Sequence, residues 1–376
     1  MSSAKKPRAL TEEAPAGQVS LSRPRPPRAI MLREIRAAPE RVEVMMERET
    51  APLERALARF RRQRPPLIFV AGRGTSHHAA IFAHYLFERF LATPVSGAAL
   101  SLFTLYPAPL NLKGALAIGI SQSGESTDVV KALRSARRMG AFTVAVTNTS
   151  GSSLTKVADH SLLLHCQKER AVAATKTYVA SLVGMVMIAR ALGADFGASE
   201  VEGIPDAIRS ALSCEDAIRE VAPYYRYATA CICLARGFNY CTVRETALKL
   251  QETCYLGASG MSAADFLHGP IAMLSETTPL VTFAADGPTY PFMLKLVQDL
   301  RRQDADILTF SNRERITKLS TPGRAGMGIH CAFELREGLS PIPFATLGQL
   351  LACHVALTRG NNPDAPRRLR KVTRTL

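Results

Sequence analysis

The sequence has 376 residues, of which 47% are hydrophobic and 21% are charged, and its formal net charge at pH 7 is +15. These proportions are typical of a folded protein with a sizeable core and exclude a disordered chain, and the length favours two domains. The sequence contains no Trp, and its basic residues do not alternate with aromatic ones as in surfaces that stack nucleic-acid bases. The positive charge therefore favours a small anionic ligand over nucleic acid.

Much of the basic charge lies near the two ends of the chain. Residues 1–29 are rich in Pro, Arg, Ala and Ser without periodicity, which predicts a flexible tail. No apolar run reaches the ~18 residues of a membrane span or has the pattern of a signal peptide, so we expect a cytoplasmic protein without membrane contact. The eight cysteines lack the spacing of metal ligands, and we expect reduced core residues and a site without metal or cofactor.

The first folded segment after the tail has apolar residues at helical spacing between Met31 and Arg61. We predict amphipathic helices in this segment, broken near Pro39 and Pro52 because proline lacks the N–H group that a helix interior needs. These helices are expected to cap the first domain.

Strand and helix patterns then alternate along the chain. A short apolar run at 67–70 leads through a glycine-rich turn into a helical pattern at 77–90. The same order recurs from 115–120 to 128–139, and another apolar run follows at 142–147. This alternation predicts a parallel sheet with helices on both faces.

The second half of the sequence repeats this arrangement. An apolar run at 230–234 is followed by a glycine turn and a helical pattern at 242–251, and the run at 280–287 takes the place of 116–124. An internal duplication explains both matches and predicts an α/β protein of two tandem domains, each a mainly parallel sheet flanked by helices in a Rossmann-like three-layer sandwich. The predicted boundaries are 1–29 for the tail, 30–195 and 205–358 for the domains, and 359–376 for a C-terminal active-site segment.

Two polar loops follow strands of the first domain. Ser121-Gln122-Ser123-Gly124-Glu125-Ser126 lies where a strand ends and a helix begins, and such a junction offers unpaired N–H groups and a favourable dipole to an anion. The alternative is an ordinary helix start with incidental serines, since Ser is a common cap residue. Three serines, a Gln and a Gly in six positions favour the anion site. Gly74-Thr75-Ser76 is a second such loop, and neighbouring strand ends of a parallel sheet meet at one crevice.

Six segments together resemble the isomerase half of glucosamine-6-phosphate synthase, the glutamine:fructose-6-phosphate aminotransferase, which consists of two sugar isomerase (SIS) domains. They are Gly74-Thr75-Ser76, residues 121–126, residues 172–176, residues 245–252, His268-Gly269-Pro270 and residues 366–373. Their order and separations fit that family, and the resemblance covers the chain from about residue 30 to its end. It implies tandem SIS domains and a small phosphorylated amino sugar as the substrate.

The resemblance also implies roles for individual residues. The implied ligands of the sugar phosphate are Thr75, Ser76, Ser121, Gln122, Ser123, Ser126, Val172 and Ala173, with Ser126 where the family often has Thr. Glu252 is the implied base that moves a proton between C2 and C1, and Glu245 and Lys249 accompany it in the catalytic segment. His268 opens the sugar ring and reaches the site of a neighbouring subunit, which implies a homodimer. Lys371 meets the open-chain carbonyl.

Chemistry gives these roles independent support. A carboxylate shielded from water can have the pKa that a base serving two adjacent carbons needs, and histidine transfers protons near neutral pH. Taken alone, the spacing of Glu245, Lys249 and Glu252 favours an exposed helix with a salt bridge. A lone histidine such as His268 is more often structural, and a basic end such as 367–374 is more often a solvated tail or an RNA-binding patch. The resemblance favours the site in each case.

One departure from the synthase bears on the reaction. The synthase carries a glutaminase domain with a terminal cysteine nucleophile, whereas Cys166 is the first cysteine here and the short tail cannot build such a domain. We therefore expect deamination, in which glucosamine 6-phosphate and water give fructose 6-phosphate and ammonia, as in the stand-alone deaminases of the SIS family. The alternatives are a deglycase that acts on phosphorylated sugar-amine adducts, and a non-catalytic sugar-phosphate-binding regulator.

Overall fold

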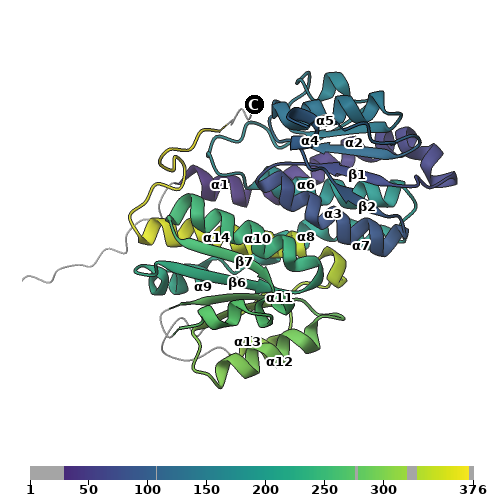
Figure 1. The fold of residues 1–376 in the computed structure, drawn as a ribbon. Coiled ribbons are helices and arrows are strands. Elements are labelled where there is room, and N and C mark those ends of the chain that lie inside the picture. The colour runs from purple at the N-terminus through teal and green to yellow at the C-terminus, as the bar shows by residue number, and fades with distance from the viewer. Residues whose placement is uncertain (1–28, 107, 276–277, 320–327, 372–376) are drawn as a thin grey trace, which may run out of the picture.

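The computed structural model describes residues 29–106, 108–275, 278–319 and 328–371. The predicted tail at 1–29 lies outside the described residues except for Ala29, and so do the last five residues of the C-terminal segment. Figure 1 shows two sheets, one in the upper half of the molecule and one in the lower half, with helices between them.

The ten described strands form two five-stranded sheets in which all neighbouring strands are parallel. The first sheet contains β1 (Ile68–Ala71), β2 (Val95–Gly97), β3 (Leu116–Ile120), β4 (Phe142–Thr147) and β5 (His160–Leu163) in the order β2-β1-β3-β4-β5. The second contains β6 (Ala230–Ala235), β7 (Gly257–Ser262), β8 (Leu280–Ala284), β9 (Ile307–Ser311) and β10 (Ile329–His330) in the order β10-β9-β8-β6-β7. The central strands β1, β3 and β8 are buried along their whole length, which explains why their sequences are continuous apolar runs.

The two sheets have the same topology. In the first sheet β1 lies between β2 and β3, and β4 and β5 follow; in the second sheet β6 lies between β7 and β8, and β9 and β10 follow. The apolar run at 280–287 forms β8, which pairs with β6 as β3 pairs with β1. The structure therefore confirms the predicted α/β class, and the matching strand orders support the predicted duplication.

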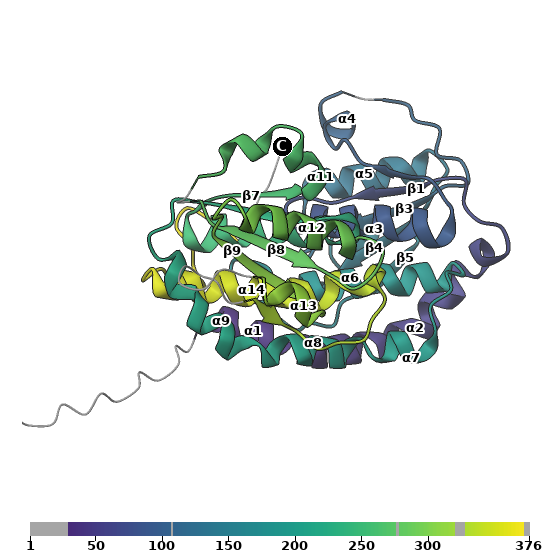
Figure 2. The ribbon, with the colours of Figure 1, turned by 90° about the horizontal axis from the view of Figure 1, so that it is seen from below.

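Helices cover both faces of each sheet. The described α-helices are α1 (Ile30–Arg36), α2 (Ala38–Arg62), α3 (Thr75–Leu91), α4 (Ser101–Thr104), α5 (Thr127–Arg138), α6 (Lys176–Ala191), α7 (Ala198–Glu202), α8 (Ile204–Ser213), α9 (Glu215–Val221), α10 (Tyr240–Lys249), α11 (Ala263–Leu267), α12 (Tyr290–Arg301), α13 (Glu314–Thr317) and α14 (Pro341–Thr358). Residues of α2, α3, α6, α10 and α14 share one buried apolar cluster with the inner faces of both sheets. Figure 1 shows α10 and α14 between the two sheets, and Figure 2 shows the same ribbon from below. Smaller clusters lie under α5 on one outer face and under α12 on the other.

The helices before the first strand differ from the prediction at one of the two prolines. α1 ends at Arg36 and α2 begins at Ala38, so the predicted break near Pro39 is present. The break predicted near Pro52 is wrong, because α2 continues through this residue to Arg62. The apolar side chains before and after Pro52 are buried on one face of α2, and this burial outweighs the loss of one hydrogen bond.

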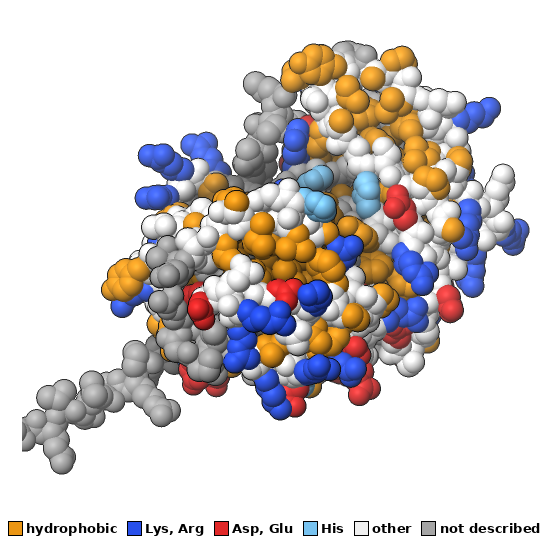
Figure 3. All heavy atoms as spheres, turned by 60° about the horizontal axis from the view of Figure 1, so that its bottom comes forward, with side chains coloured by type: hydrophobic (Ala, Val, Ile, Leu, Met, Phe, Trp, Pro, Cys, Tyr) orange, Lys and Arg blue, Asp and Glu red, His pale blue; other side chains and the backbone are white. Residues whose placement is uncertain are grey.

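The last helix, α14, is apolar and long enough to cross a membrane by length and composition alone. It is nevertheless a core helix, because 89% of its apolar window is buried inside the fold, where it packs against α8 and α10. The surface has a different character: in the view of Figure 3, lysine and arginine side chains are spread over both halves rather than gathered in one patch.

Candidate active site

The serine loop, residues 121–126, connects β3 to α5 and has a fixed backbone. The N–H of Asn148 donates to the carbonyl of Gln122 at 3.0 Å, and the N–H of Leu154 donates to the carbonyl of Gly124 at 2.9 Å. Gly124 has a φ of +69°, and a Cβ at this position would lie 2.1 Å from Oγ of Ser152. Glycine is therefore required here, because any larger residue would displace the loop.

The hydroxyl groups of this loop are not used to cap the helix that follows. Ser126 occupies the cap position of α5 but makes no side-chain cap hydrogen bond, and its Oγ lies 3.1 Å from Oγ of Ser121. Oγ of Ser123 accepts the N–H of Glu125 at 3.2 Å. The carboxylate of Glu125 is bound by the N–H and hydroxyl of Ser153 at 2.9 and 2.7 Å. This arrangement favours an anion site over a helix start with incidental serines.

The second loop, at Gly74, precedes α3 and is tied to the serine loop by an ion pair. Gly74 has a φ of +51°, and Thr75 and Ser76 form the first turn of α3. Nε of Arg73 donates to the buried carboxylate of Asp128, in the first turn of α5, at 2.6 Å. Because a guanidinium carries five N–H donors, Arg73 keeps donors for an anion between the two loops.

The two loops enclose a cavity of about 340 Å³. Its lining residues are Arg73, Gly74, Thr75, Ser76, Ser121, Gln122, Ser123, Ser126, Asp128, Val172, Ala174, Thr177, Tyr178, Ser181 and Lys371. All the predicted phosphate and sugar ligands line it except Ala173, which is buried. The structure thus brings residues from distant parts of the chain, including Lys371, around one space.

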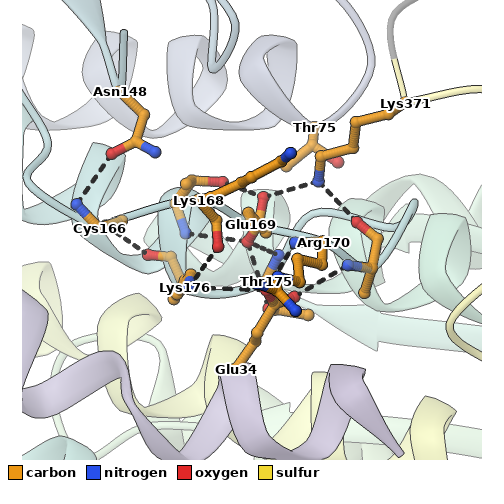
Figure 4. Close-up of polar contacts among 12 residues, drawn as sticks. Glu34, Thr75, Asn148, Cys166, Lys168, Glu169, Arg170, Thr175, Lys176 and Lys371 are labelled. Carbon is orange, nitrogen blue, oxygen red and sulfur yellow. Dashed lines mark hydrogen bonds and ion pairs between the residues drawn. The ribbon is translucent and has the colours of Figure 1, made fainter.

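Lys371 is held at this cavity by two hydrogen bonds (Figure 4). Its Nζ donates to the carboxylate of Glu169 at 3.0 Å and to the carbonyl of Ala171 at 2.7 Å. The carboxylate of Glu169 is buried and also accepts the N–H of Thr175 at 2.8 Å and the hydroxyl of Thr177 at 2.7 Å. Glu169 therefore anchors Lys371 and caps the start of α6 at the same time.

A second buried carboxylate, that of Glu34 in α1, supports the loop at 168–175. It accepts the N–H of Arg170 at 2.6 Å and the N–H of Ala171 at 3.2 Å, and Nζ of Lys176 lies 3.6 Å away. These contacts hold the backbone of the loop in place between α1 and α6. They thereby place Val172 at the cavity.

The C-terminal segment runs over both domains before it reaches the cavity. The carboxylate of Asp364 accepts the N–H groups of Ile30 and Met31 at 2.8 and 2.7 Å, and its carbonyl accepts the N–H of Val172 at 3.0 Å. Further along, the guanidinium of Arg367 lies 4.2 Å above the ring of Tyr255 in the second domain. These contacts fix the segment that carries Lys371.

The predicted catalytic helix carries a buried charge cluster beside the cavity. Nζ of Lys249 lies 3.4 Å from the carboxylate of Glu245, is hydrogen-bonded to the carboxylate of Glu252, and donates to Oγ1 of Thr75 at 3.2 Å. The Thr75 hydroxyl donates in turn to Glu245 at 3.1 Å. Burial alone would lower the pKa of Lys249, but the charges of Glu245 and Glu252 outweigh it and raise that pKa. Thr75 thus connects the cavity to the cluster.

Glu252 itself lies in a turn that the sequence did not predict. α10 ends at Lys249 and continues as the π-helical turn η4 (Leu250–Cys254), which stops at Tyr255 with a φ of +58°. π-helical turns are often found at functional sites. The side chain of Glu252 is 22% exposed and bound to Lys249, and it is not among the lining residues of the cavity.

His268 is the one predicted catalytic residue that is placed apart from the others. It follows α11 as its C-terminal cap residue and is exposed. The cavity lining does not include it. Within a single chain the fold therefore brings together Lys371, Thr75 and the Glu252 cluster but leaves His268 outside, and its catalytic role stays a prediction.

Three residues of the site were missed in the sequence. Arg73 lies inside the glycine-rich turn, Glu169 lies just before the predicted segment 172–176, and Nδ1 of His78 is 2.7 Å from the carboxylate of Glu245. The available signal was weak: an arginine inside the glycine turn, and an acidic residue seven positions before the first residue of a helix.

The residues that the structure describes give little support for a metal site or a reactive thiol. Within residues 29–106, 108–275, 278–319 and 328–371, no group of three or more His, Cys, Asp or Glu side chains is arranged to hold a metal ion. All eight cysteines are free and buried. Burial raises the pKa of Cys241 and of Cys254 to about 12, which leaves both thiols unreactive.

The first sheet and its helices form a sugar isomerase (SIS) domain. Residues 63–191 match the SIS domain family, and the second sheet repeats the strand order of the first. The chain therefore belongs to the proteins that consist of tandem SIS domains.

Relatives and solved structures agree with this class. The isomerizing glutamine–fructose-6-phosphate aminotransferase of Pyrococcus horikoshii is 35% identical over 310 residues, which cover 81% of this chain and 51% of that protein. The chain thus spans about half the length of the curated relatives it matches, and the resemblance to their isomerase half is confirmed. A candidate phosphosugar isomerase structure from Silicibacter pomeroyi has a TM-score of 0.79 at 29% identity and covers 89% of this chain and 100% of that one. Glucosamine-6-phosphate deaminase of Thermotoga maritima shares the fold, with a TM-score of 0.72 at 20% identity over 92% of this chain and 100% of that one.

Proposed function

We propose that this protein converts glucosamine 6-phosphate and water into fructose 6-phosphate and ammonia. The observation that supports the proposal most is the single cavity lined by the serine loop, Thr75 and Lys371, with Glu252 bound to Lys249 behind Thr75. The loop suits the phosphate at one end of the sugar, and the lysine and carboxylate suit the carbonyl and the C2 proton at the other end. A cytoplasmic location accompanies the proposal, because eight free thiols suit a reducing compartment.

The proposed reaction balances with water as the only second reactant. Once the sugar ring is open, Glu252 takes the proton from C2 and returns it to C1, and a second proton passes from the C2 amino group to the oxygen on C1. The double bond thereby moves from the C1 carbonyl to a C2 imine. Water then adds to the imine and releases ammonia. Lys371 is held as a cation beside Glu169 and stabilises the negative charge that develops on the carbonyl oxygen.

The direction toward ammonia is favoured by the cysteines of this sequence. Synthesis of the amino sugar from glutamine needs a reactive thiolate, and all eight thiols of the sequence are buried in the fold. Deamination needs none of them. The proposal concerns the reaction of these 376 residues.

The purified protein incubated with glucosamine 6-phosphate is expected to produce ammonia and fructose 6-phosphate in equal amounts. Glu252→Gln keeps the size of the side chain, and we expect it to bind the substrate while turnover falls by about 10²- to 10⁴-fold, as for loss of a general base. No product from glucosamine 6-phosphate would contradict the proposal. Turnover of a fructosamine 6-phosphate instead would identify a deglycase, and phosphosugar binding without turnover would identify a regulator.

We further propose that the protein is a homodimer in which His268 opens the sugar ring in the neighbouring subunit. Its exposed position outside its own cavity supports this assignment. Co-expressed Glu252→Gln and His268→Asn chains, each nearly inactive alone, are expected to form mixed dimers with one intact site and to recover activity. A mixture as inactive as its parents would contradict the shared site.

A further inference from the structure

A second cavity, of about 540 Å³, lies on the other side of the glycine loop between α3, α10 and β7. Arg73 and Gly74 line both cavities, so this loop lies between them. The second cavity has room for several water molecules, each of which takes ~30 Å³ in the liquid. His78 lines it although the residue is only 5% exposed. The imidazole therefore stands between the second cavity and the interior.

An unbroken chain of ionisable groups leads from His78 to the proposed base. Nδ1 of His78 is 2.7 Å from Oε2 of Glu245, and Oε1 of Glu245 is 3.4 Å from Nζ of Lys249. Nζ of Lys249 is also hydrogen-bonded to Oε2 of Glu252. The side chains of the first three groups are nearly inaccessible, with exposed fractions of 7%, 2% and 0%, so water does not bypass them. Among the described residues, the printed contacts of their polar side-chain atoms are with one another, with Thr75 and with Glu252.

The need to balance the charge of Glu245 does not explain why the residue at position 78 is a histidine. Lys249 and the Thr75 hydroxyl already satisfy Oε1 of Glu245, and an ordinary amide or hydroxyl would satisfy Oε2 at lower desolvation cost than an ionisable ring. Imidazole differs from those groups because it accepts a proton on one nitrogen and releases one from the other.

We propose that His78, Glu245 and Lys249 form a proton path that exchanges the proton on Glu252 with water in the second cavity. The inference rests on the proposed function, because the proton on Glu252 comes from C2 of the sugar. Lys249 gives a proton to Glu245 as it receives one from Glu252 and so remains an ammonium. The imidazole accepts the proton from Glu245 at Nδ1 in the ring tautomer that carries its proton on Nε2, and it releases that Nε2 proton to water. In the other tautomer the Nδ1–H group donates to Glu245. Each step conserves charge. His78 acts on Glu252 through Glu245 and Lys249, so it is a positioning residue.

The path predicts the fate of a label at C2. With [2-²H]glucosamine 6-phosphate in ordinary water, the wild-type protein loses much of the deuterium before Glu252 returns a proton to C1. Blocking the path with His78→Phe is expected to raise the deuterium retained at C1 of fructose 6-phosphate several-fold, as measured by mass spectrometry. His78→Asn places an amide N–H near the position of Nδ1, so it restores the support of Glu245 and most of the turnover lost in His78→Phe, but retention stays high because an amide does not relay protons.

His77→Asn is the matched control, because His77 lines the same cavity one residue earlier and does not bond Glu245 among the described contacts. It is expected to keep the wild-type retention. Equal retention in wild type, His78→Phe and His78→Asn would overturn the path, and so would full retention in the wild type. Absence of any fructose 6-phosphate from the wild type would instead overturn the proposed function, and this inference with it.

Discussion

Ser123 lines the cavity, and its Oγ accepts the N–H of Glu125 in the same loop. Hydrogen bonds to charged groups contribute about 1.5–3 kcal/mol, so Ser123→Ala is expected to weaken binding of glucosamine 6-phosphate about 10- to 100-fold. Titration calorimetry measures this change. Ser135→Ala, in α5 but outside the cavity, provides the control and is expected to bind as the wild type does. Equal affinity in both variants would remove Ser123 from the phosphate site.

Substitution of Lys249 tests the buried charge cluster through its effect on the unfolding free energy. Its side chain is fully buried between two carboxylates, so Lys249→Met leaves them without their cation. Breaking such a pair costs about 3–5 kcal/mol of unfolding free energy. Lys318→Met removes one partner of an exposed pair on α13, where the expected loss is within about 1 kcal/mol. Urea unfolding measures the unfolding free energy of both variants. A loss in Lys249→Met as small as that in Lys318→Met would show that water reaches the cluster.

Residues that carry motifs were predictable from the sequence, and residues that support them were not. The serine loop combines donors at a strand end, which is a local pattern, and its place in the cavity follows the prediction. Glu169 and His78 act through partners that are distant in the chain: Glu169 binds Lys371 and His78 binds Glu245. No local pattern marks such pairs, because the fold alone brings them together.

At the scale of elements, the strands were predicted best because buried parallel strands are continuous apolar runs. The predicted runs at 115–120 and 142–147 agree with β3 and β4 to within one residue. The π-helical turn η4 was missed because its sequence has helical periodicity, and only the left-handed backbone of Tyr255 reveals where the helix ends. α2 passes through Pro52 because its buried face holds the helix together.

Helix α9 links α1 and α14 through one carboxylate, which gives a prediction about pH. Glu215 binds the guanidinium of Arg36 at 2.7 and 2.8 Å and Nε2 of His354 at 3.2 Å. Burial would raise the pKa of Glu215, but the hydrogen bonds from His354 and Arg36 outweigh it and lower the pKa from 4.5 to about 2. A pKa lowered by folding stabilises the protein above the unfolded value, and this contribution is lost as the pH falls through the folded value.

We therefore expect the unfolding free energy of Glu215→Gln to fall less steeply than that of the wild type as the pH decreases from 4.5 to about 2. Thermal unfolding at a series of pH values measures the slope. Glu47→Gln, an exposed position on α2, serves as the control. Identical slopes in all three proteins would show that Glu215 does not link these helices.

At the scale of the whole molecule, the two domains share a topology but differ in chemistry. The first domain has the serine loop between β3 and α5, whereas the corresponding loop of the second domain, between β8 and α12, is occupied by the protein itself. There the buried carboxylate of Glu337 accepts the N–H of Thr289 at 3.3 Å and its hydroxyl at 2.5 Å. A Cβ on Gly287 would lie 2.6 Å from the same carboxylate. An internal carboxylate thus occupies the corresponding position of the second domain, whereas the loop of the first domain borders the cavity proposed for the phosphate.

The central claim is that one cavity holds a phosphorylated amino sugar with its phosphate on the serine loop and its reacting carbons toward Glu252 and Lys371. A crystal structure of Glu252→Gln with glucosamine 6-phosphate tests it most directly. We predict phosphate oxygens within hydrogen-bond distance of Ser121, Ser123 and Ser126, and C1 and C2 beside residues 252 and 371. A phosphosugar bound elsewhere, or bound here with its phosphate away from the serine loop, would contradict the account.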